Sequence, residues 1–158
     1  LFPHGVLFRD EEIAMREQLI KGDYLDAVIG LGPNLFFNAS MEACIIICNN
    51  NKPTERKNKV LLIDAKEEVT RKNAESFLEP THIKKIADAY KEFEAIAGFS
   101  SIVTNDMLLE RNANLNIAAH VTKENQQEVR ALFDAYSDWA RQSIDTKKQF
   151  LNLLNLLS

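Results

Sequence analysis

Two short apolar runs, joined by a loop with two adjacent phenylalanines, form the central pattern of the chain. The first run is Leu25–Leu31 and the second is Ala43–Cys48. Both are rich in β-branched residues and flanked by turn formers, which predicts strands buried on both faces of a sheet. The linking segment is long for a hairpin and has no helical period, and such loops are either functional or disordered. Phe36 and Phe37 either pack back onto the core or serve a site.

The residues before these strands predict a strand, a helix and a crossover. Residues 5–8 have the pattern of a strand end. Residues 10–21 have a helical period, with Asp10 as the N-cap and Gly22 just beyond the last turn. Together with the first apolar run they predict a right-handed βαβ unit. The second apolar run is then expected to return antiparallel beside the first.

The middle of the chain predicts one more strand and one long helix. Residues 60–65 predict a strand, with Asp64 capping the turn that follows. Residues 66–78 are charged and weakly patterned, which predicts a loop or a frayed helix. An amphipathic helix is predicted at 81–96, capped by Thr81 and ended by Gly98.

The remainder begins with short elements and ends with a heptad pattern. A strand is predicted at Ser100–Thr104, a helical turn at 106–111 and an Asx-rich turn at 112–116. From 122 to 157 apolar residues recur every three or four positions, which predicts a long helix with a coiled-coil-type seam. The seam residues are Val129, Leu132, Tyr136, Trp139, Ser143, Thr146, Phe150, Leu153 and Leu157. This helix either packs its first half on the domain, with a frayed tail, or binds a partner through the large side chains of the seam.

Composition and charge narrow the class of protein. The 158 residues fit one domain with an appendage, and 46% hydrophobic with 27% charged residues is ordinary for a globular chain. A net charge of −4 argues against a surface that coats nucleic acid, although a local basic rim stays open. No apolar stretch is long enough to span a bilayer and no secretory signal pattern occurs, so we expect a cytoplasmic protein without a membrane partner.

Cys44 and Cys48 lie four residues apart in one predicted strand. Their backbones would stand ~13 Å apart at ~3.3 Å per residue. A disulfide needs Cα atoms within ~7 Å, so the pair cannot form one. No His or Asp pattern accompanies them, so a metal site is not expected. Both are predicted to be small core residues in a reducing compartment.

Residues 49–59, NNNKPTERKNK, form a polar and basic segment with two interpretations. Most such segments are solvated turns. The alternative is a rim near the phenylalanine loop, in which Lys52, Arg56, Lys57 and Lys59 contact DNA phosphates.

Five motifs, in order along the chain, resemble one protein family. They are PHGVLFR (3–9), LDAVIGL-x-PNLFFN (25–38), ACIII (43–47), KVLLIDA (59–65) and NLNI (114–117). The set resembles the modification (M) subunit of type I restriction-modification systems, an N6-adenine DNA methyltransferase. The chain departs from the family pattern at Gly32, where a second proline is usual, and at Ala113, where tyrosine is usual.

The resemblance implies an α/β fold: the C-terminal part of a Rossmann-like S-adenosylmethionine-dependent methyltransferase sheet, with the reversed strand inserted between the other two. A helical C-terminal extension would follow. The chain then divides into a methyltransferase half (1–65), a mixed α/β continuation (66–121) and a long amphipathic helix (122–158). The family's Gly-rich cofactor loop and its Asn-Pro-Pro-aromatic tetrapeptide are expected upstream of Pro3. We therefore expect a C-terminal fragment that binds no metal and is inactive alone, with S-adenosylmethionine bound upstream.

The resemblance also implies a target-base loop and a set of partners. Methylation of adenine N6 requires the base to leave the duplex stack, and an aromatic ring then holds it. The matching position here is Phe36, with Phe37 second, while Pro33, Asn34 and Asn38 would orient the loop or reach a phosphate. The implied partners are the specificity subunit, a second modification subunit, the restriction subunit and double-stranded DNA.

Two other hypotheses remain open from the sequence. The chain could be a non-catalytic α/β adaptor that presents its C-terminal helix to a protein partner. It could also be a small independent enzyme that uses Asp64 or His4, although no nucleophile–base pair is evident. His82, in the first turn of a predicted helix, is expected to be exposed rather than a ligand.

Overall fold

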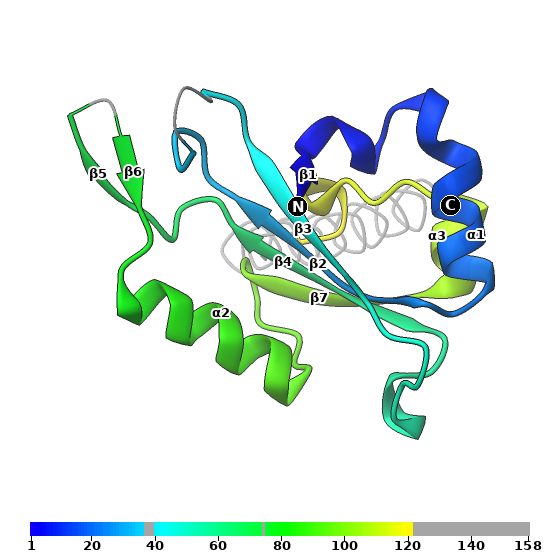
Figure 1. Ribbon diagram of the computed structural model, residues 1–158. Helices are drawn as coiled ribbons and strands as arrows, with labels where there is room; N and C mark the ends of the chain where they lie inside the picture. Colours follow the sequence, from blue (N-terminus) through cyan, green and yellow to red (C-terminus); the bar gives the residue numbers. More distant parts are fainter. Residues whose placement is uncertain (37–39, 74, 122–158) are drawn as a thin grey trace, which may run out of the picture. The chain divides into compact units, whose positions relative to one another are not determined.

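A computed structural model describes residues 1–36, 40–73 and 75–121, which form an α/β domain around a mixed sheet (Figure 1). The sheet has five strands in the order β1-β3-β2-β4-β7. In that order the strands are Phe2–Pro3, Ala43–Cys48, Leu25–Leu31, Lys59–Ala65 and Ser100–Thr104. β2 and β4 are parallel, and the other neighbouring pairs are antiparallel.

The central strand β2 is buried along its whole length, as its apolar run predicts, and Asp26 within the strand is buried as well. β3 runs antiparallel beside it, from Leu31 opposite Ala43 to Leu25 opposite Cys48. β1 pairs with the other edge of β3, so the reversed strand lies between β1 and β2. The predicted strand pair and the predicted place of the reversed strand are therefore confirmed.

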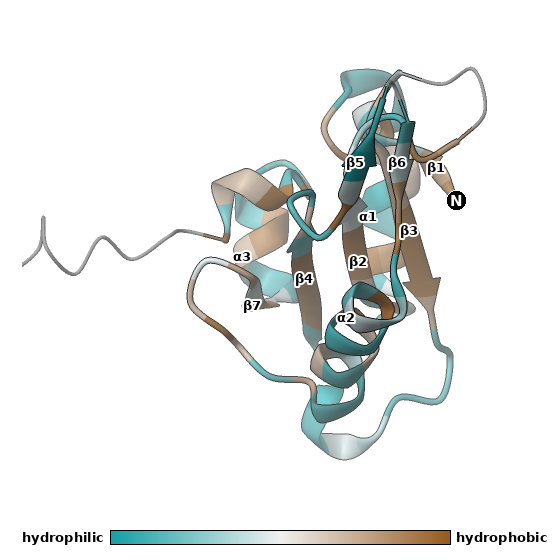
Figure 2. Ribbon diagram, turned by 90° about the vertical axis from the view of Figure 1, so that its left-hand side faces the viewer, coloured by the Kyte–Doolittle hydropathy of each residue, from teal (hydrophilic) through white to brown (hydrophobic). Residues whose placement is uncertain are grey.

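Each face of the sheet has its own apolar cluster, because side chains alternate along the strands. Val28 and Leu62 face a cluster that includes residues of α1 (Ile13–Lys21) and α3 (Asn105–Glu110). Their sequence neighbours face the opposite cluster, which α2 (Pro80–Glu92) covers (Figure 2). The sheet is thus a middle layer with helices on both faces.

The strand end predicted around Gly5 is a 3-10 turn instead, so that prediction was wrong. Only Phe2–Pro3 pairs as a strand, and His4–Leu7 turns away from the sheet. The backbone N–H groups of Phe8 and Arg9 both donate to the carbonyl of Gly5, which closes the turn. The order strand, helix, strand is kept, with a first strand of two residues.

The ends of α1 differ from the predicted caps. Asp10 lies inside a separate 3-10 turn, and α1 itself begins at Ile13. At the other end Gly22 is right-handed, with φ −77°, and Asp23 takes the left-handed conformation, with φ 53°. An aspartate tolerates this conformation better than most residues, and tertiary hydrogen bonds to its carboxylate hold it there.

Residues 66–78 contain a β-hairpin, where a loop or a frayed helix was predicted. The hairpin consists of β5 (Thr70–Lys72) and β6 (Glu75–Phe77), with Asn73 in the turn at φ 58°. It stands beyond the carboxyl end of β4, apart from the main sheet (Figure 1). Its strands are too short and too charged for the apolar pattern to reveal them.

Helix α2 is shorter than predicted. It begins at Pro80, and Glu79 rather than Thr81 provides the N-terminal capping box. It ends at Glu92, where Phe93 takes a left-handed conformation with φ 49°, five residues before Gly98. Gly98 has φ 70° and belongs to the turn that leads into β7.

The two cysteines form no disulfide, as their spacing predicts. Cys44 is buried, and burial raises the pKa of its thiol to about 11. Cys48 is exposed, so the prediction of two core cysteines was wrong for this residue. It is the last residue of β3, where β1 no longer pairs alongside.

The elements β4, β7 and α3 lie close to where the sequence predicts them. The backbone N–H of Asn116 donates to the side chain of Asn114, which confirms the Asx turn. The predicted seam helix, including Leu132, Tyr136, Trp139, Phe150, Leu153 and Leu157, lies outside the described residues, and the domain division stays a prediction. Within the described part of the chain, no helix is long and apolar enough to cross a membrane.

Candidate functional site

The loop after β2 directs an aliphatic side chain inward and an aromatic one outward. Pro33 and Asn34 form a turn at the carboxyl end of β2, and Asn34 is left-handed with φ 60°. Leu35 packs against the apolar cluster under α2, whereas Phe36 is 40% exposed. Phe36 therefore does not pack in the core, and an accessible aromatic ring lies at this edge of the sheet.

Two contacts hold the base of this loop. A Cβ atom on Gly32 would lie only 2.6 Å from the carbonyl oxygen of Lys66, so glycine permits the close approach of the segment after β4. The backbone N–H of Ser76, on β6, donates to the carbonyl of Asn34 over 2.9 Å. The loop is thereby tied to the β5–β6 hairpin.

Of the other predicted loop residues, the structure describes Pro33 and Asn34. Phe37 and Asn38 lie outside the described residues, and their roles stay predictions. Pro33 shapes the turn, and Asn34 is held through its backbone carbonyl rather than its side-chain amide.

A small polar cluster lies at the same end of the sheet. Lys66 Nζ is 2.8 Å from Glu42 Oε2, and His4 Nδ1 is 3.8 Å from the same oxygen. The backbone N–H of His4 also donates to the carbonyl of Glu42. Burial, reinforced by Lys66, lowers the pKa of His4, so its imidazole is neutral near pH 7.

The described structure shows the surroundings of His4 and Asp64, the two residues considered for an independent enzyme. His4 Nε2 is buried and has no hydrogen-bond partner within the described structure. Asp64 accepts a hydrogen bond from the backbone N–H of Lys66, which is the turn-capping role that the sequence predicts. In the described parts of the chain, no three His, Cys, Asp or Glu residues are arranged to hold a metal ion.

The basic segment 49–59 lies at the opposite end of the sheet from Phe36. It joins the end of β3 to the start of β4, next to the amino end of β2. The prediction of a basic rim close to the phenylalanine loop was therefore wrong, because β2 separates the two by its full length.

Three of the four cations in this segment have structural partners, and the third of them, Lys59, donates from Nζ to the carbonyl of Glu55 over 3.2 Å. Lys52 is buried, with its Nζ 2.7 Å from Asp23 Oδ1 and 2.9 Å from the carbonyl of Lys59. Arg56 donates to two backbone carbonyls at the end of α2. Lys57 and Lys59 are exposed. Phosphate contacts by these four side chains stay a prediction.

Sequence reasoning missed a buried arginine that joins the regions of two motifs. Arg16, on α1, is 1% exposed. Its guanidinium donates to the carbonyls of Val6, Arg9 and Ala113. These bonds fasten the PHGVLFR segment to the turn that precedes NLNI. One available signal was the position of Arg16, on the same helical face as Ile13 and Ile20.

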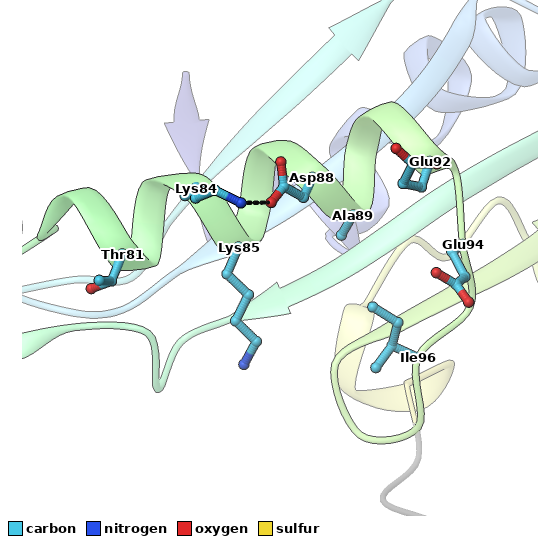
Figure 3. Close-up of a pocket in the computed structure, with 8 residues that line it drawn as sticks. All are labelled: Thr81, Lys84, Lys85, Asp88, Ala89, Glu92, Glu94 and Ile96. Atoms are coloured by element: carbon cyan, nitrogen blue, oxygen red, sulfur yellow. Dashed lines mark hydrogen bonds and ion pairs between the residues drawn. The ribbon is translucent and has the colours of Figure 1, made fainter.

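A groove runs along α2, beside the segment that follows it (Figure 3). Lys84 Nζ is 2.7 Å from Asp88 Oδ2 on its rim. Lys85 pairs with Glu68 and lies 4.3 Å from the ring centroid of Phe99. Both lysines are thus engaged with carboxylates, and the groove holds no evident chemistry.

Comparisons with known proteins agree on one family. The family model of the N-6 DNA methylases matches residues 1–129. Two methylase subunits of type I restriction enzymes from Methanocaldococcus jannaschii are similar to this chain. MjaVIII is 34% identical over 85% of this chain and 24% of its own length, and MjaVII is 35% identical over 78% and 22%.

A solved structure gives the same assignment. The crystal structure of the type I restriction-modification methyltransferase subunit from Streptococcus thermophilus superposes with a TM-score of 0.69 at 38% identity. The match covers 75% of this chain and 25% of that subunit. The chain thus spans about a quarter of the length of the relatives it matches. By sequence and by fold, it belongs to the N-6 DNA methylase family and is similar to a part of the methylase subunits of type I restriction-modification systems.

Proposed function

We propose that this chain supplies the target-adenine loop of a type I modification subunit, with Phe36 as the ring that stacks on the adenine. The observation that carries the proposal is the exposure of Phe36 at the carboxyl edge of β2, next to the inward-packed Leu35. An exposed phenylalanine loses contact with the core, and a stacking role accounts for its position. Stacking on an aromatic ring stabilises an extruded base by about 1–3 kcal/mol.

The role of the chain in methylation is to hold the base, since adenine N6 is out of reach inside the duplex. The left-handed turn at Asn34 and the bond from Ser76 fix the base of the loop before DNA arrives. A pre-positioned ring costs little ordering entropy when it stacks. The loop therefore favours the adenine that is extruded from the duplex over the adenine that is stacked within it.

The family implies S-adenosylmethionine as the methyl donor, but the described residues do not fit a cofactor cradle. The space beside the one Gly-x-Gly sequence, Gly30-Leu31-Gly32, is occupied by other parts of the protein. A Cβ on Gly30 would lie 2.8 Å from Ile117 Cδ1, and one on Gly32 meets the Lys66 carbonyl. These glycines allow close packing, and we assign no cofactor contact to this chain.

In the complete modification subunit, assembled with its specificity subunit, Phe36→Ala should impair methylation much more than folding. A loss of about 1–3 kcal/mol corresponds to a roughly 5- to 150-fold lower rate at subsaturating DNA. Fluorescence of 2-aminopurine placed at the target adenine reports extrusion directly, and its increase on binding should be lost or reduced.

Tyr24→Ala is the matched control, because Tyr24 is 49% exposed at the opposite end of β2. It should leave both methylation and the 2-aminopurine signal unchanged. Normal extrusion and methylation by Phe36→Ala, with loss in Phe37→Ala, would move the role to Phe37. Normal activity per folded molecule together with lower stability in Phe36→Ala would contradict a functional loop.

We further propose that the complete subunit assembles with the specificity subunit, a second modification subunit and the restriction subunit on double-stranded DNA. The support is membership of the type I family and the apolar seam of the sequence between 129 and 157. The seam provides the kind of helix surface that docks on another helix.

A further inference from the structure

The β5–β6 hairpin places two cations next to the loop that carries Phe36. Arg71 and Lys72 are exposed on β5. Neither forms an ion pair with any of the residues that the structure describes. The strand itself is polar along its length (Figure 2).

The pairing of β5 with β6 and the bond from Ser76 to Asn34 give the distance from Arg71 to the loop. Ser76 on β6 bonds to Asn34, and Arg71 on β5 lies opposite Ser76. Two strand spacings of ~4.8 Å put the Arg71 backbone ~10 Å from Asn34. That distance corresponds to about three base-pair steps of ~3.4 Å. Arg71 therefore lies within reach of the backbone that flanks a base stacked on Phe36.

The two cations differ in their neighbours across the hairpin. Lys72 lies opposite Glu75, whose carboxylate partly offsets its charge. Arg71 lies opposite the hydroxyl residue Ser76, so no acid stands across from it. Of the other nearby cations, Lys66 is bonded to Glu42. Arg71 is therefore the cation best placed to take an external anion.

We propose that Arg71 binds a backbone phosphate of the DNA duplex within a few base pairs of the target adenine. The inference rests on the proposed function of the Phe36 loop and extends it to a second contact on a separate element. A guanidinium matches a phosphate with two parallel hydrogen bonds. Because β6 is bonded to the loop through Asn34, a phosphate held on β5 fixes the DNA backbone relative to the stacking ring.

The experiment measures duplex affinity of the complete modification–specificity complex against salt concentration. Each phosphate contact contributes about 0.9 to the slope of log K against log salt. Arg71→Gln should therefore lower that slope by about 1, for specific and non-specific duplexes alike. When the salt concentration rises from about 50 to 200 mM, the factor by which the affinity falls should be about three times larger for the wild type than for the variant. Arg71→Lys should retain the slope.

Lys91→Gln is the matched control, since Lys91 is exposed in the last turn of α2, at the far end of the sheet from Phe36. It should leave the slope unchanged. An unchanged slope and affinity in Arg71→Gln, while Phe36→Ala still abolishes the 2-aminopurine signal, would overturn the hairpin contact and leave the loop proposal intact. A lowered slope in Arg71→Gln with a normal signal in Phe36→Ala would support the phosphate contact and reject the loop proposal.

Discussion

Asp23 shows how one side chain connects several segments of this domain. Its carboxylate accepts hydrogen bonds from Lys52 Nζ, from the backbone N–H of Asn58 and from Asn105 Nδ2. Burial by itself raises the pKa of Asp23, but these hydrogen bonds outweigh it and hold the pKa below its ordinary value of 3.8. Asp23 thereby joins the end of α1 to the basic segment and to the start of α3.

The depressed pKa of Asp23 predicts a specific pH dependence of stability. A carboxylate whose pKa is lower in the folded state stabilises the fold above its unfolded pKa and loses that contribution as pH falls through the folded value. Asp23→Asn should therefore lower the free energy of unfolding at pH 7. The difference from wild type should shrink as pH falls below about 4. Urea unfolding at a series of pH values measures both, and a difference that does not change with pH would contradict this assignment.

At the scale of elements, helix α2 is attached to β2 and to the basic segment through one buried carboxylate. Asp26 is 0% exposed, and its Oδ2 lies 2.7 Å from the Tyr90 hydroxyl and 3.6 Å from a nitrogen of Arg56. The guanidinium carbon of Arg56 lies 5.3 Å from the ring centroid of Tyr90 and 4.6 Å from that of Phe93. Phe93, whose ring contacts the Arg56 guanidinium, takes the left-handed conformation at the end of α2.

Tyr90→Phe should destabilise the domain by about 1–3 kcal/mol, because it removes a hydrogen-bond donor from a buried carboxylate. Burial and the neighbouring Asp26 also raise the pKa of the Tyr90 hydroxyl, which therefore stays a donor at neutral pH. Urea denaturation measures the change. Tyr24→Phe is the control, since Tyr24 is exposed, and it should cost little. Equal stability of the two variants would show that the Tyr90 hydroxyl contributes nothing net.

At the scale of the whole molecule, different structural features lie at the two ends of the sheet. The carboxyl end of β2 has the Phe36 loop and the β5–β6 hairpin. The amino end has the Asp23–Lys52 pair, and Arg56 there pairs with Asp26 and donates to the end of α2. The first arrangement leaves an aromatic ring and a guanidinium accessible, and the second uses its charges to connect segments. The length of β2 thus separates the accessible ring and guanidinium from the ion pairs that connect segments.

Deleting residues 147–158 from the complete subunit should leave the α/β domain folded and abolish assembly with the specificity subunit. The deleted part removes the last large apolar side chains of the seam, Phe150, Leu153 and Leu157. Large exposed apolar surfaces usually mark protein partners. Co-purification measures assembly, and circular dichroism of the variant checks folding.

A substitution pair sharpens the same test. Leu153→Asp with Leu157→Asp changes two seam positions, whereas Asn152→Asp with Asn155→Asp adds the same charges off the seam. Only the first pair should prevent assembly. Normal yields of complex with the first pair or with the truncated subunit would show that the seam is not the docking surface.

The sequence by itself determined the central strands, their burial and the loop that carries Phe36. The reason is that a long apolar run has few stable environments, and a buried strand is the one that suits Leu25–Leu31. The sequence also determined the family, because five motifs in order carry more information than any single motif. Asp64 as a turn cap and the Asx turn at Asn114 followed from local hydrogen bonding, which needs no distant partner.

Only the tertiary structure decided where the polar residues go. One of two interpretations placed Lys52 and Arg56 near the loop of Phe36, but the fold carries them to the other end of β2. The left-handed residues Asp23 and Phe93 ended helices where glycines were expected, in each case beside a long-range contact of the side chain. The β5–β6 hairpin was not predicted because its strands have no apolar period. Local patterns report burial, whereas the position of a charged side chain depends on partners far away in sequence.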